Sequence, residues 1–442
     1  RDQLMRIIGN NPAADNAEIT AVASGTMADG NTVIVNADGT VSVVAGLNVA
    51  QNIGAATSIT ATGSAQSGVA YDSNAGKVVV TWRGVPTTSY YPHAAVGTVS
   101  GSTISFGTPV VVSSSAQGHK TGVVYHEAAQ KVVITWADTG NSSRPYAKVG
   151  TVSGTSLSVG GARLISSTST SCPQIAATYD KAAEKIVFAY RFGGKVYSKV
   201  GTVSGSSITV GAETIAFNSN TSPINSRFGI TYEENAQKVV LVGSTQTLFG
   251  DNRVRGRVGT VSGTSISFGT QLLFGGTDSD NPMVAYDANA QRVVVVYQDK
   301  SNSSYPTAIV GRVSGTSLSS FGTPVVYRSA GGTDVYMSAV YDPSVQKTNL
   351  AATGNIYAGT VSSNSISVGS PSTFYGASTD VLMAYDSGNN RIVVSYQHSG
   401  TKAIVFQNAY ISTNLTAENF IGFANGAAAD GGTARVQLGS GI

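Results

Sequence analysis

The apolar positions of this chain fall into short runs of mainly β-branched residues, separated by Gly, Ser, Asn and Asp. One stretch shows the pattern in full, with apolar runs in residues 283–287, 292–297, 308–315 and 318–326. Short β-branched runs bounded by turn residues are typical of strands, and no helical spacing of apolar residues recurs. The pattern therefore predicts an all-β chain in which this stretch contributes four strands.

The same stretch recurs along the chain, marked each time by a tyrosine that precedes a Lys or Arg by six positions. An acidic residue usually follows the tyrosine, and successive tyrosines lie about 50 residues apart, the size class of propeller blades and solenoid turns. With four antiparallel strands in each of seven units, the predicted fold is a seven-bladed β-propeller. The marker pairs are Tyr71/Lys77, Tyr125/Lys131, Tyr179/Lys185, Tyr232/Lys238, Tyr286/Arg292, Tyr341/Lys347 and Tyr385/Arg391.

A solenoid is the other architecture for a repeat of this size. Helical solenoids are excluded because no helical period recurs, and a parallel β-helix would need coils of roughly 20 to 30 residues running in one strand direction. The short Ser-Gly-Thr-Ser and Asp/Asn-rich turns instead suit antiparallel neighbours, so the propeller is favoured.

The seventh unit lacks a matching fourth strand, because the chain departs from the repeat after Ile411. The segment near residues 52–60 resembles the missing strand and directly precedes the first unit. We expect this segment to complete the last blade and close the ring, which would leave no long open edge.

Two flanks lie outside the predicted ring. Residues 1–48 contain two alternating runs across an Asp38-Gly39 turn, a strong hairpin signal, and residues 412–442 contain a further β segment. The predicted domains are thus 1–48, a propeller over 49–411, and 412–442. Because ring closure brings the two ends together, the flanks are expected to form one small β module that serves as the attachment point.

Composition narrows the possible partners. Only 12% of the residues are charged and the net charge is +3, without a cluster of Lys and Arg among aromatics, so nucleic acid is not expected to bind. No apolar run approaches the roughly 18 residues of a membrane span, so membrane insertion is not expected either. Cys172 is the single cysteine, interpreted as a small buried hydrophobic residue.

Loop lengths indicate which face of the propeller carries function. The first-to-second and third-to-fourth turns of each unit are short and nearly constant, whereas the second-to-third loops and the connections between units vary and share the opposite face. Variable loops on a rigid scaffold are where binding usually occurs. The candidate ligand-binding residues on this face are Trp82, Arg83, Tyr91, His93, Asp138, Arg144, Tyr146, Arg191, Asp251, Arg253, Gln298, Asp299, Tyr305, Gln397 and His398.

Aromatic faces beside amide, carboxylate and guanidinium groups suit sugars, whose C–H faces stack and whose hydroxyls need donors and acceptors. The competing interpretation is that strand-end aromatics such as Trp82, Trp136 and Tyr190 cap the blade core. The repeated Tyr-Asp and Lys/Arg positions are interpreted as structural, through strand pairing and a charge contact across the turn.

No catalytic, metal or cofactor motif is recognisable, and the chain is expected not to be an enzyme. The four histidines lack the spacing of metal ligands, and there is no nucleophile elbow or phosphate-binding loop. A propeller hydrolase would need two close carboxylates near the centre of the variable face. The candidates by loop position are Asp138, Asp251, Asp299, Asp334 and Asp380.

A family resemblance rests on residues 285–287 with 293–295, the 302–305 loop, residues 258–270 and residues 413–422. These segments resemble the propeller repeats of tail-fibre-like proteins of marine bacteriophages. The similarity covers about residues 30–436, and the sixth unit departs from it by carrying Thr348-Asn349-Leu350 in place of a valine run.

This resemblance implies a virion appendage on the particle surface that contacts a host-surface glycan or envelope component. It also implies contacts with other virion proteins through the flanks and allows a homo-oligomer. The alternatives are a purely structural decoration or assembly protein, a glycan hydrolase or lyase, and a secreted bacterial lectin.

Overall fold

The computed structural model describes residues 18–60, 65–84, 90–114, 118–167, 172, 174–218, 227–246, 252–332, 336–375, 379–415 and 419–438. The chain divides into two compact units, one made of Arg1–Gln51 with Ala409–Ile442 and the other of Asn52–Asn408. Within the described ranges, no helix is long and apolar enough to cross a membrane.

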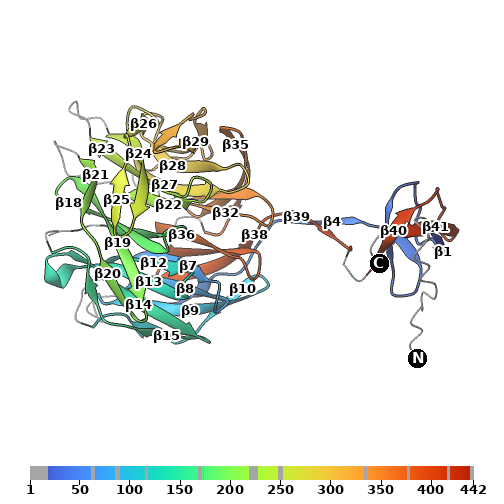
Figure 1. Ribbon diagram of the computed structural model, residues 1–442, viewed down its shortest axis with the longest axis horizontal. Coiled ribbons are helices and arrows are strands. Elements are labelled where there is room, and N and C mark those ends of the chain that lie inside the picture. The colour runs from blue at the N-terminus through green and yellow to red at the C-terminus, as the bar shows by residue number, and fades with distance from the viewer. Residues whose placement is uncertain are drawn as a thin grey trace. The chain divides into compact units, whose positions relative to one another are not determined.

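The larger unit is all-β and propeller-like. Its consecutive antiparallel sheets have four or five strands each, and the first strand of each sheet lies against the first strand of the next (Figure 1). In Figure 1, β7, β12, β22, β27, β32 and β36 gather towards the middle of this unit, with β15 and β35 at its margin. These inner strands are β7 (Ala65–Asp72), β12 (Gly118–His126), β17 (Ile175–Asp180), β22 (Phe228–Glu233), β27 (Ser279–Asp287), β32 (Met337–Asp342) and β36 (Thr379–Asp386).

The second and third strands of each sheet form its buried middle. The second strands are β8 (Lys77–Arg83), β13 (Lys131–Asp138), β18 (Lys185–Phe192), β23 (Lys238–Gln246), β28 (Arg292–Asp299), β33 (Lys347–Ala352) and β37 (Arg391–Gln397). The third strands are β9 (Pro92–Ser100), β14 (Arg144–Ser153), β19 (Lys195–Ser204), β24 (Asn252–Ser262), β29 (Tyr305–Ser314), β34 (Asn355–Ser362) and β38 (Thr401–Gln407). A short 3-10 helix, η2 (Thr139–Asn141), lies between β13 and β14.

The outer strand is usually broken into two short pieces that pair with the same third strand, a feature that the sequence analysis did not anticipate. The first pieces are β10 (Thr103–Phe106), β15 (Ser156–Val159), β20 (Ser207–Val210), β25 (Ser265–Phe268) and β30 (Ser317–Ser319), while β35 (Ser365–Thr373) is continuous. The second pieces are β11 (Val110–Val111), β16 (Arg163–Leu164), β21 (Thr214–Asn218), β26 (Leu272–Phe274) and β31 (Val325–Val326).

The sheet of the seventh repeat takes its outer strands from the other end of the unit. β5 (Asn52–Ile53) and β6 (Thr57–Ser58) both pair antiparallel with β38. The sequence analysis assigned this segment to the last unit, and in the structure its two strands lie there.

The continuous β-branched runs result from burial on both faces of each second strand. Val78, Val79 and Val80 of β8 are all fully buried. Val78 and Val80 pack with Val393 of the seventh repeat, whereas Val79 packs with the second repeat. A strand covered on both faces contains apolar residues without alternation.

The acidic residue that follows six of the seven marker tyrosines stabilises its own turn, so the predicted charge contact with the Lys or Arg across the turn is wrong. Asp72 is 1% exposed, and its Oδ1 accepts hydrogen bonds from the backbone N–H groups of Asn74 and Ala75 at 3.1 and 2.9 Å. Within the described ranges no ion pair joins Asp72 to Lys77. A buried carboxylate gains more from two backbone donors than from a solvent-exposed ammonium.

The marker tyrosines connect each repeat to the turn of the preceding one. The Tyr125 hydroxyl accepts a hydrogen bond from the Asn74 N–H at 3.2 Å, and equivalent bonds join Tyr179 to Ala128 and Tyr232 to Ala182. The same relation joins the ends of the series, because the Gly388 N–H of the seventh repeat donates to the Tyr71 hydroxyl of the first at 3.1 Å.

Glycines of the outer strands form a second series of connections. A Cβ at Gly107 would lie 2.1 Å from the carbonyl oxygen of Thr155, in the third-to-fourth turn of the next repeat. The same close approach occurs at Gly160, Gly211, Gly269 and Gly322. It occurs again at Gly54, where a Cβ would lie 1.7 Å from the Ser102 carbonyl oxygen, which connects the seventh repeat to the first.

The smaller unit contains a five-stranded sheet and a two-stranded ladder, each built from both ends of the chain. The strand order of the five-stranded sheet is β1 (Glu18–Val22), β41 (Thr433–Leu438), β40 (Phe420–Ala424), β2 (Thr32–Val35) and β3 (Val41–Val43). β2 and β3 pair across the Asp38-Gly39 turn, where the sequence analysis placed a hairpin. The two-stranded ladder pairs β4 (Gly46–Val49) with β39 (Tyr410–Thr413).

The glycine contacts generate a stability prediction. Gly54→Ala should lower the free energy of unfolding by about 1–3 kcal/mol, because the added methyl group overlaps a backbone oxygen that cannot rotate away. The matched control is Gly369→Ala, at the corresponding outer-strand position of the sixth repeat, where the nearest atom to a Cβ is 3.5 Å away. The control should change stability by less than about 0.5 kcal/mol in urea unfolding. Equal values for the two variants would contradict the proposed role of the Gly54 contact.

Candidate functional site

The strand-end aromatics belong to the blade core. Trp82, Trp136 and Tyr190 are 2%, 1% and 0% exposed. Each stacks on a ring of the third strand of its own sheet, with centroid separations of 5.7 Å for Trp82–His93 and 5.8 Å for Trp136–Tyr146. Trp82 is therefore withdrawn from the ligand-binding candidates, because a ring packed in the core cannot stack on a sugar.

The remaining candidates of the first two repeats contact their own loops. Arg83 lies over the Tyr90 ring at 4.8 Å, and His93 Nδ1 lies 2.7 Å from the Tyr91 carbonyl oxygen. In the second repeat, Asp138 Oδ1 accepts a hydrogen bond from the Gly140 N–H at 3.0 Å. Asn141 bridges the other two candidates there, by donating to the Tyr146 hydroxyl at 2.6 Å and accepting from Arg144 at 3.4 Å.

The candidates of the later repeats are equally local. Gln298 is fully buried and donates to the Gly332 carbonyl at 2.6 Å, so it supports a loop instead of facing solvent. Asp299 accepts a hydrogen bond from the Ser301 hydroxyl at 2.5 Å and is paired in register with Tyr305. The His398 ring packs on Tyr375 at 3.8 Å, beside Gln397 at the end of β37. Arg253 pairs in register with Thr245, and Asp251 lies outside the described residues.

The structure thus does not bring the predicted loop residues together into one site. Of the five candidate carboxylates, Asp251 and Asp334 lie outside the described residues, while Asp138 and Asp299 bind their own loops. Asp380 is the exception, because it forms an ion pair with Arg227 of the fourth repeat. Arg191 also lies near the centre, where its charge interacts with Asp280.

A ring of polar positions surrounds one end of the inner strands. The residue five positions before each marker tyrosine is polar in every repeat, and these residues are Gln66, Lys120, Gln174, Arg227, Asn281, Tyr336 and Asp380. The structure describes the side chains of the last five. Because the inner strands lie side by side, equivalent positions on them converge around the same central space.

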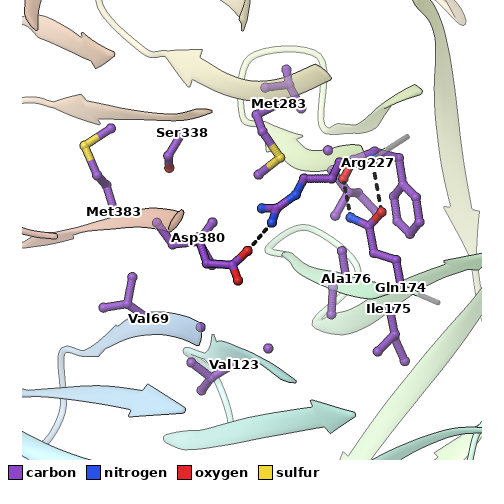
Figure 2. A pocket seen from close by; sticks show the side chains of 18 of the residues that line it. Val69, Val123, Gln174, Ile175, Ala176, Arg227, Met283, Ser338, Asp380 and Met383 are labelled. Atoms are coloured by element: carbon purple, nitrogen blue, oxygen red, sulfur yellow. Dashed lines mark hydrogen bonds and ion pairs between the residues drawn. The ribbon is translucent and has the colours of Figure 1, made fainter. Parts of the chain in front are cut away.

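Arg227 holds this polar ring together. Its guanidinium forms an ion pair with Asp380, a residue of the seventh repeat 153 positions further along the chain. It also lies over the Tyr336 ring at 4.3 Å, and the Arg227 backbone N–H donates to Asn281 Oδ1 at 3.2 Å. Figure 2 shows the guanidinium extending across the middle of the cavity towards Asp380. Through its side chain and its backbone N–H, this one residue therefore links the fourth, fifth, sixth and seventh repeats.

Gln174 fixes the polar ring to the backbone of the next repeat. Its Nε2 donates to the Phe228 carbonyl at 3.1 Å, and its Oε1 accepts from the Phe228 N–H at 3.2 Å (Figure 2). The Gln174 amide has two N–H donors and one oxygen with two lone pairs. After this reciprocal pair, one N–H and one lone pair have no hydrogen-bond partner among the described residues.

A cavity of about 250 Å³ lies at the polar ring. Its walls come from the inner strands of every repeat and include Val69, Val123, Ile175 and Met283 (Figure 2). Gly68, Gly122 and Gly229, each three residues before its marker tyrosine, also line the cavity and leave space in it because they have no side chain. The cavity therefore combines an apolar wall with one amide, one cation and one anion, from Gln174, Arg227 and Asp380. Asn281 and Tyr336 do not line it but contact Arg227.

Further charges lie close to this ring. Asp280 accepts hydrogen bonds from Lys300 Nζ at 2.9 Å and from the Ser244 hydroxyl at 2.7 Å. Burial lowers the pKa of Arg191 to about 10, an effect that the nearby Cys172 thiol and the Asp280 carboxylate partly offset. Cations thus outnumber anions among the described charges here, which are Arg191, Arg227, Lys300, Asp280 and Asp380.

Loop reasoning missed Gln174, Arg227, Asn281 and Tyr336, although the repeat itself carried a signal. Aligning the units on their tyrosines shows one column that is polar in every unit while its residue type changes. A position with a purely structural role keeps its residue type from repeat to repeat, as the tyrosine does. The residue at this position changes between repeats but is always polar, which is typical of a binding position. The residues around it described by the structure contain no group of His, Cys, Asp and Glu that could hold a metal ion.

Comparison with known proteins adds little to this geometry. No family model matches the chain, and no curated protein matches it. Among solved structures, AofleA from Arthrobotrys oligospora is similar, with a TM-score of 0.44 and 9% identity over 89% of this chain and 98% of that chain. A similarity at this level carries no functional argument.

Cys172 provides a test of how firmly the site is closed. The thiol is 1% exposed and donates to the Gln174 carbonyl at 3.1 Å, and burial raises its pKa to about 11. Because the thiolate is the reactive species, the folded protein should resist alkylation at pH 8, and labelling should follow unfolding in urea. Rapid labelling without denaturant, measured by mass spectrometry, would show that the region beside Gln174 opens readily.

Proposed function

We propose that this chain is a non-enzymatic binding protein on the surface of a bacteriophage particle, built on a closed seven-bladed β-propeller. In this proposal it recognises a host-surface glycan or envelope component. The observation that carries the binding role is the convergence of Gln174, Arg227 and Asp380, from three different repeats, on a single cavity lined by all the inner strands. These groups are an amide, a cation and an anion, and dissimilar groups on a repetitive scaffold allow it to recognise an asymmetric ligand.

Two independent contacts support ring closure. The Tyr71–Gly388 hydrogen bond and the Gly54–Ser102 approach repeat, between the seventh and first repeats, the contacts that join neighbours elsewhere. An open array would leave the first and last sheets with unpaired faces, whereas here β8 packs against the seventh repeat.

The role of Asp380 supports binding over hydrolysis. A glycosidase uses two carboxylates that flank the scissile bond. In this cavity the described carboxylate instead forms an ion pair with Arg227, so it orients a guanidinium. Arg227 in turn is suited to holding a polar ligand in place.

The smaller unit is the proposed attachment point for other virion proteins. It joins both ends of the chain in one sheet, and its exposed apolar residues include Leu47, Ile411 and Phe423 at 60%, 73% and 46% exposure. Many copies on one particle, whether separate or in a homo-oligomer, would gain avidity from weak single sites.

These exposed apolar residues also favour a second candidate function, a purely structural decoration or assembly protein. In that case the smaller unit binds virion subunits and the cavity has no ligand. The two candidates differ in whether the larger unit binds a cell surface.

Binding of the full chain to candidate host cells and to a glycan array tests the proposal. Tyr336→Ala removes the ring that supports the Arg227 guanidinium at the cavity and should weaken binding at least about tenfold, or ~1.4 kcal/mol. Tyr410→Ala removes a half-exposed ring from the smaller unit and should leave cell binding within about twofold, which makes it the matched control.

The same wells distinguish the alternatives. Loss of binding only in the Tyr91, Tyr146 and Tyr305 triple alanine variant would place recognition on separate loops. Release of oligosaccharide products would indicate an enzyme. Absence of binding to any cell or glycan, with binding to other virion proteins, would support the structural role.

A further inference from the structure

We propose that the central cavity binds the carboxylate of an acidic sugar, with Arg227 as the anchoring residue. This inference rests on the proposed glycan-binding function and specifies its ligand class. It concerns the polar ring, which the loop-based candidates do not include.

Arg227 has donors to spare. A guanidinium carries five N–H donors in a planar fork. Among the described residues, the guanidinium hydrogen-bonds only to Asp380, through Nη2, and stacks on the face of the Tyr336 ring. The side chain is 15% exposed, so the remaining donors lie at the cavity and not deep in the core. Planar donors of this kind bind a carboxylate with two parallel hydrogen bonds.

Tyr336 and Asp380 act as positioning residues for Arg227. The Tyr336 ring supports one face of the guanidinium, and the Asp380 carboxylate fixes its Nη2 edge. Asp380 lies at a shift in strand register with a φ of 53°, as does Asn281 at the equivalent position with a φ of 52°, and Asp and Asn adopt this conformation readily. A cation held on one face and one edge is preorganised to bind an anion through its remaining donors.

The surroundings favour an anion over a cation. Arg191 and Lys300 add two positive charges near the ring, against one further negative charge from Asp280. Burial of these groups reduces screening by water, so a carboxylate that enters the cavity is attracted more strongly than at an open surface.

The shape and chemistry of the cavity favour a sugar ring as the carrier of this carboxylate. About 250 Å³ is smaller than pockets for drug-sized ligands, which begin near ~300 Å³, and it suits one ring. Gln174 has an unused N–H and Ser338 lines the wall, so hydroxyl groups find partners beside the apolar side chains. An acidic peptide side chain would use the guanidinium but not these hydroxyl partners.

Isothermal titration of the full chain with an oligo-hexuronate and with its carboxyl-reduced counterpart tests the inference. The acidic form should bind at least tenfold more tightly, and this preference should shrink as the salt concentration rises. R227K keeps a positive charge beside Asp380 but lacks the planar fork, so it should lose at least tenfold affinity for the acidic form and little for the reduced form. R255K, at a half-buried arginine of β24 that does not line the cavity and is not among the ligand-binding candidates, is the control and should match the unchanged protein.

Thermal melts check that each variant folds. If R227K melts far below the unchanged protein, Tyr336→Leu provides the alternative, because it removes the support of the guanidinium and keeps the ion pair. It should reduce the preference for the acidic form several-fold.

The remaining outcomes separate the inference from the function on which it rests. Equal binding of the two oligosaccharides would overturn the carboxylate site while leaving glycan recognition intact. Equally tight binding of poly-glutamate would overturn the sugar and indicate an acidic peptide. If cells and glycans of every kind fail to bind, the proposed function itself fails.

Discussion

Burial of each sheet on both faces is the constraint on which the larger unit depends. A second strand such as β8 sends Val78 and Val80 to one neighbouring repeat and Val79 to the other, so no sheet can bury its apolar residues alone. Stability is then shared around the series, as in other repeat proteins whose units contact only their neighbours. The tyrosine and glycine contacts act on this packing by fixing the spacing between sheets, because a hydrogen bond and a backbone approach both tolerate little change in distance.

The same constraint explains why the fold class could be predicted from the sequence. Two-sided burial produces continuous β-branched runs, and a constant neighbour relation produces a constant repeat, so both signals are local in the chain. The predicted charge contact across the turn was wrong because the turn's backbone N–H groups, which carry no sequence signal, bind the carboxylate of Asp72 first. Trp82 was misplaced for a related reason, since a strand-end aromatic has the same sequence pattern whether it packs on His93 or on a ligand.

The candidate site was hidden for a different reason. Arg227 and Asp380 are 153 positions apart, and nothing in either local segment indicates that they pair. Only the combination of an aligned repeat with the closure of the inner strands brings them together. Loop length directs attention to the outside of a propeller-like fold, but the position shared by every repeat lies at its centre, where a change in one residue alters the chemistry and not the packing.

This separation of roles accounts for how a repeated scaffold can carry a specific site. The tyrosine and the turn carboxylate are nearly invariant among the repeats because they accept hydrogen bonds from the same backbone N–H groups. The outer glycine is nearly invariant because it leaves room for a carbonyl oxygen of the next repeat. The polar position five residues before each tyrosine makes no such repeated contact, so its residue type can differ between repeats. It is an amide in Gln174, a cation in Arg227, a phenol in Tyr336 and an anion in Asp380. Because these groups lie at the beginning of inner strands that pack against a neighbour on both sides, their positions are set by the packing of the whole series. Rigid placement of a few dissimilar polar groups around an apolar cavity is the physical requirement for selective binding of a small polar ligand.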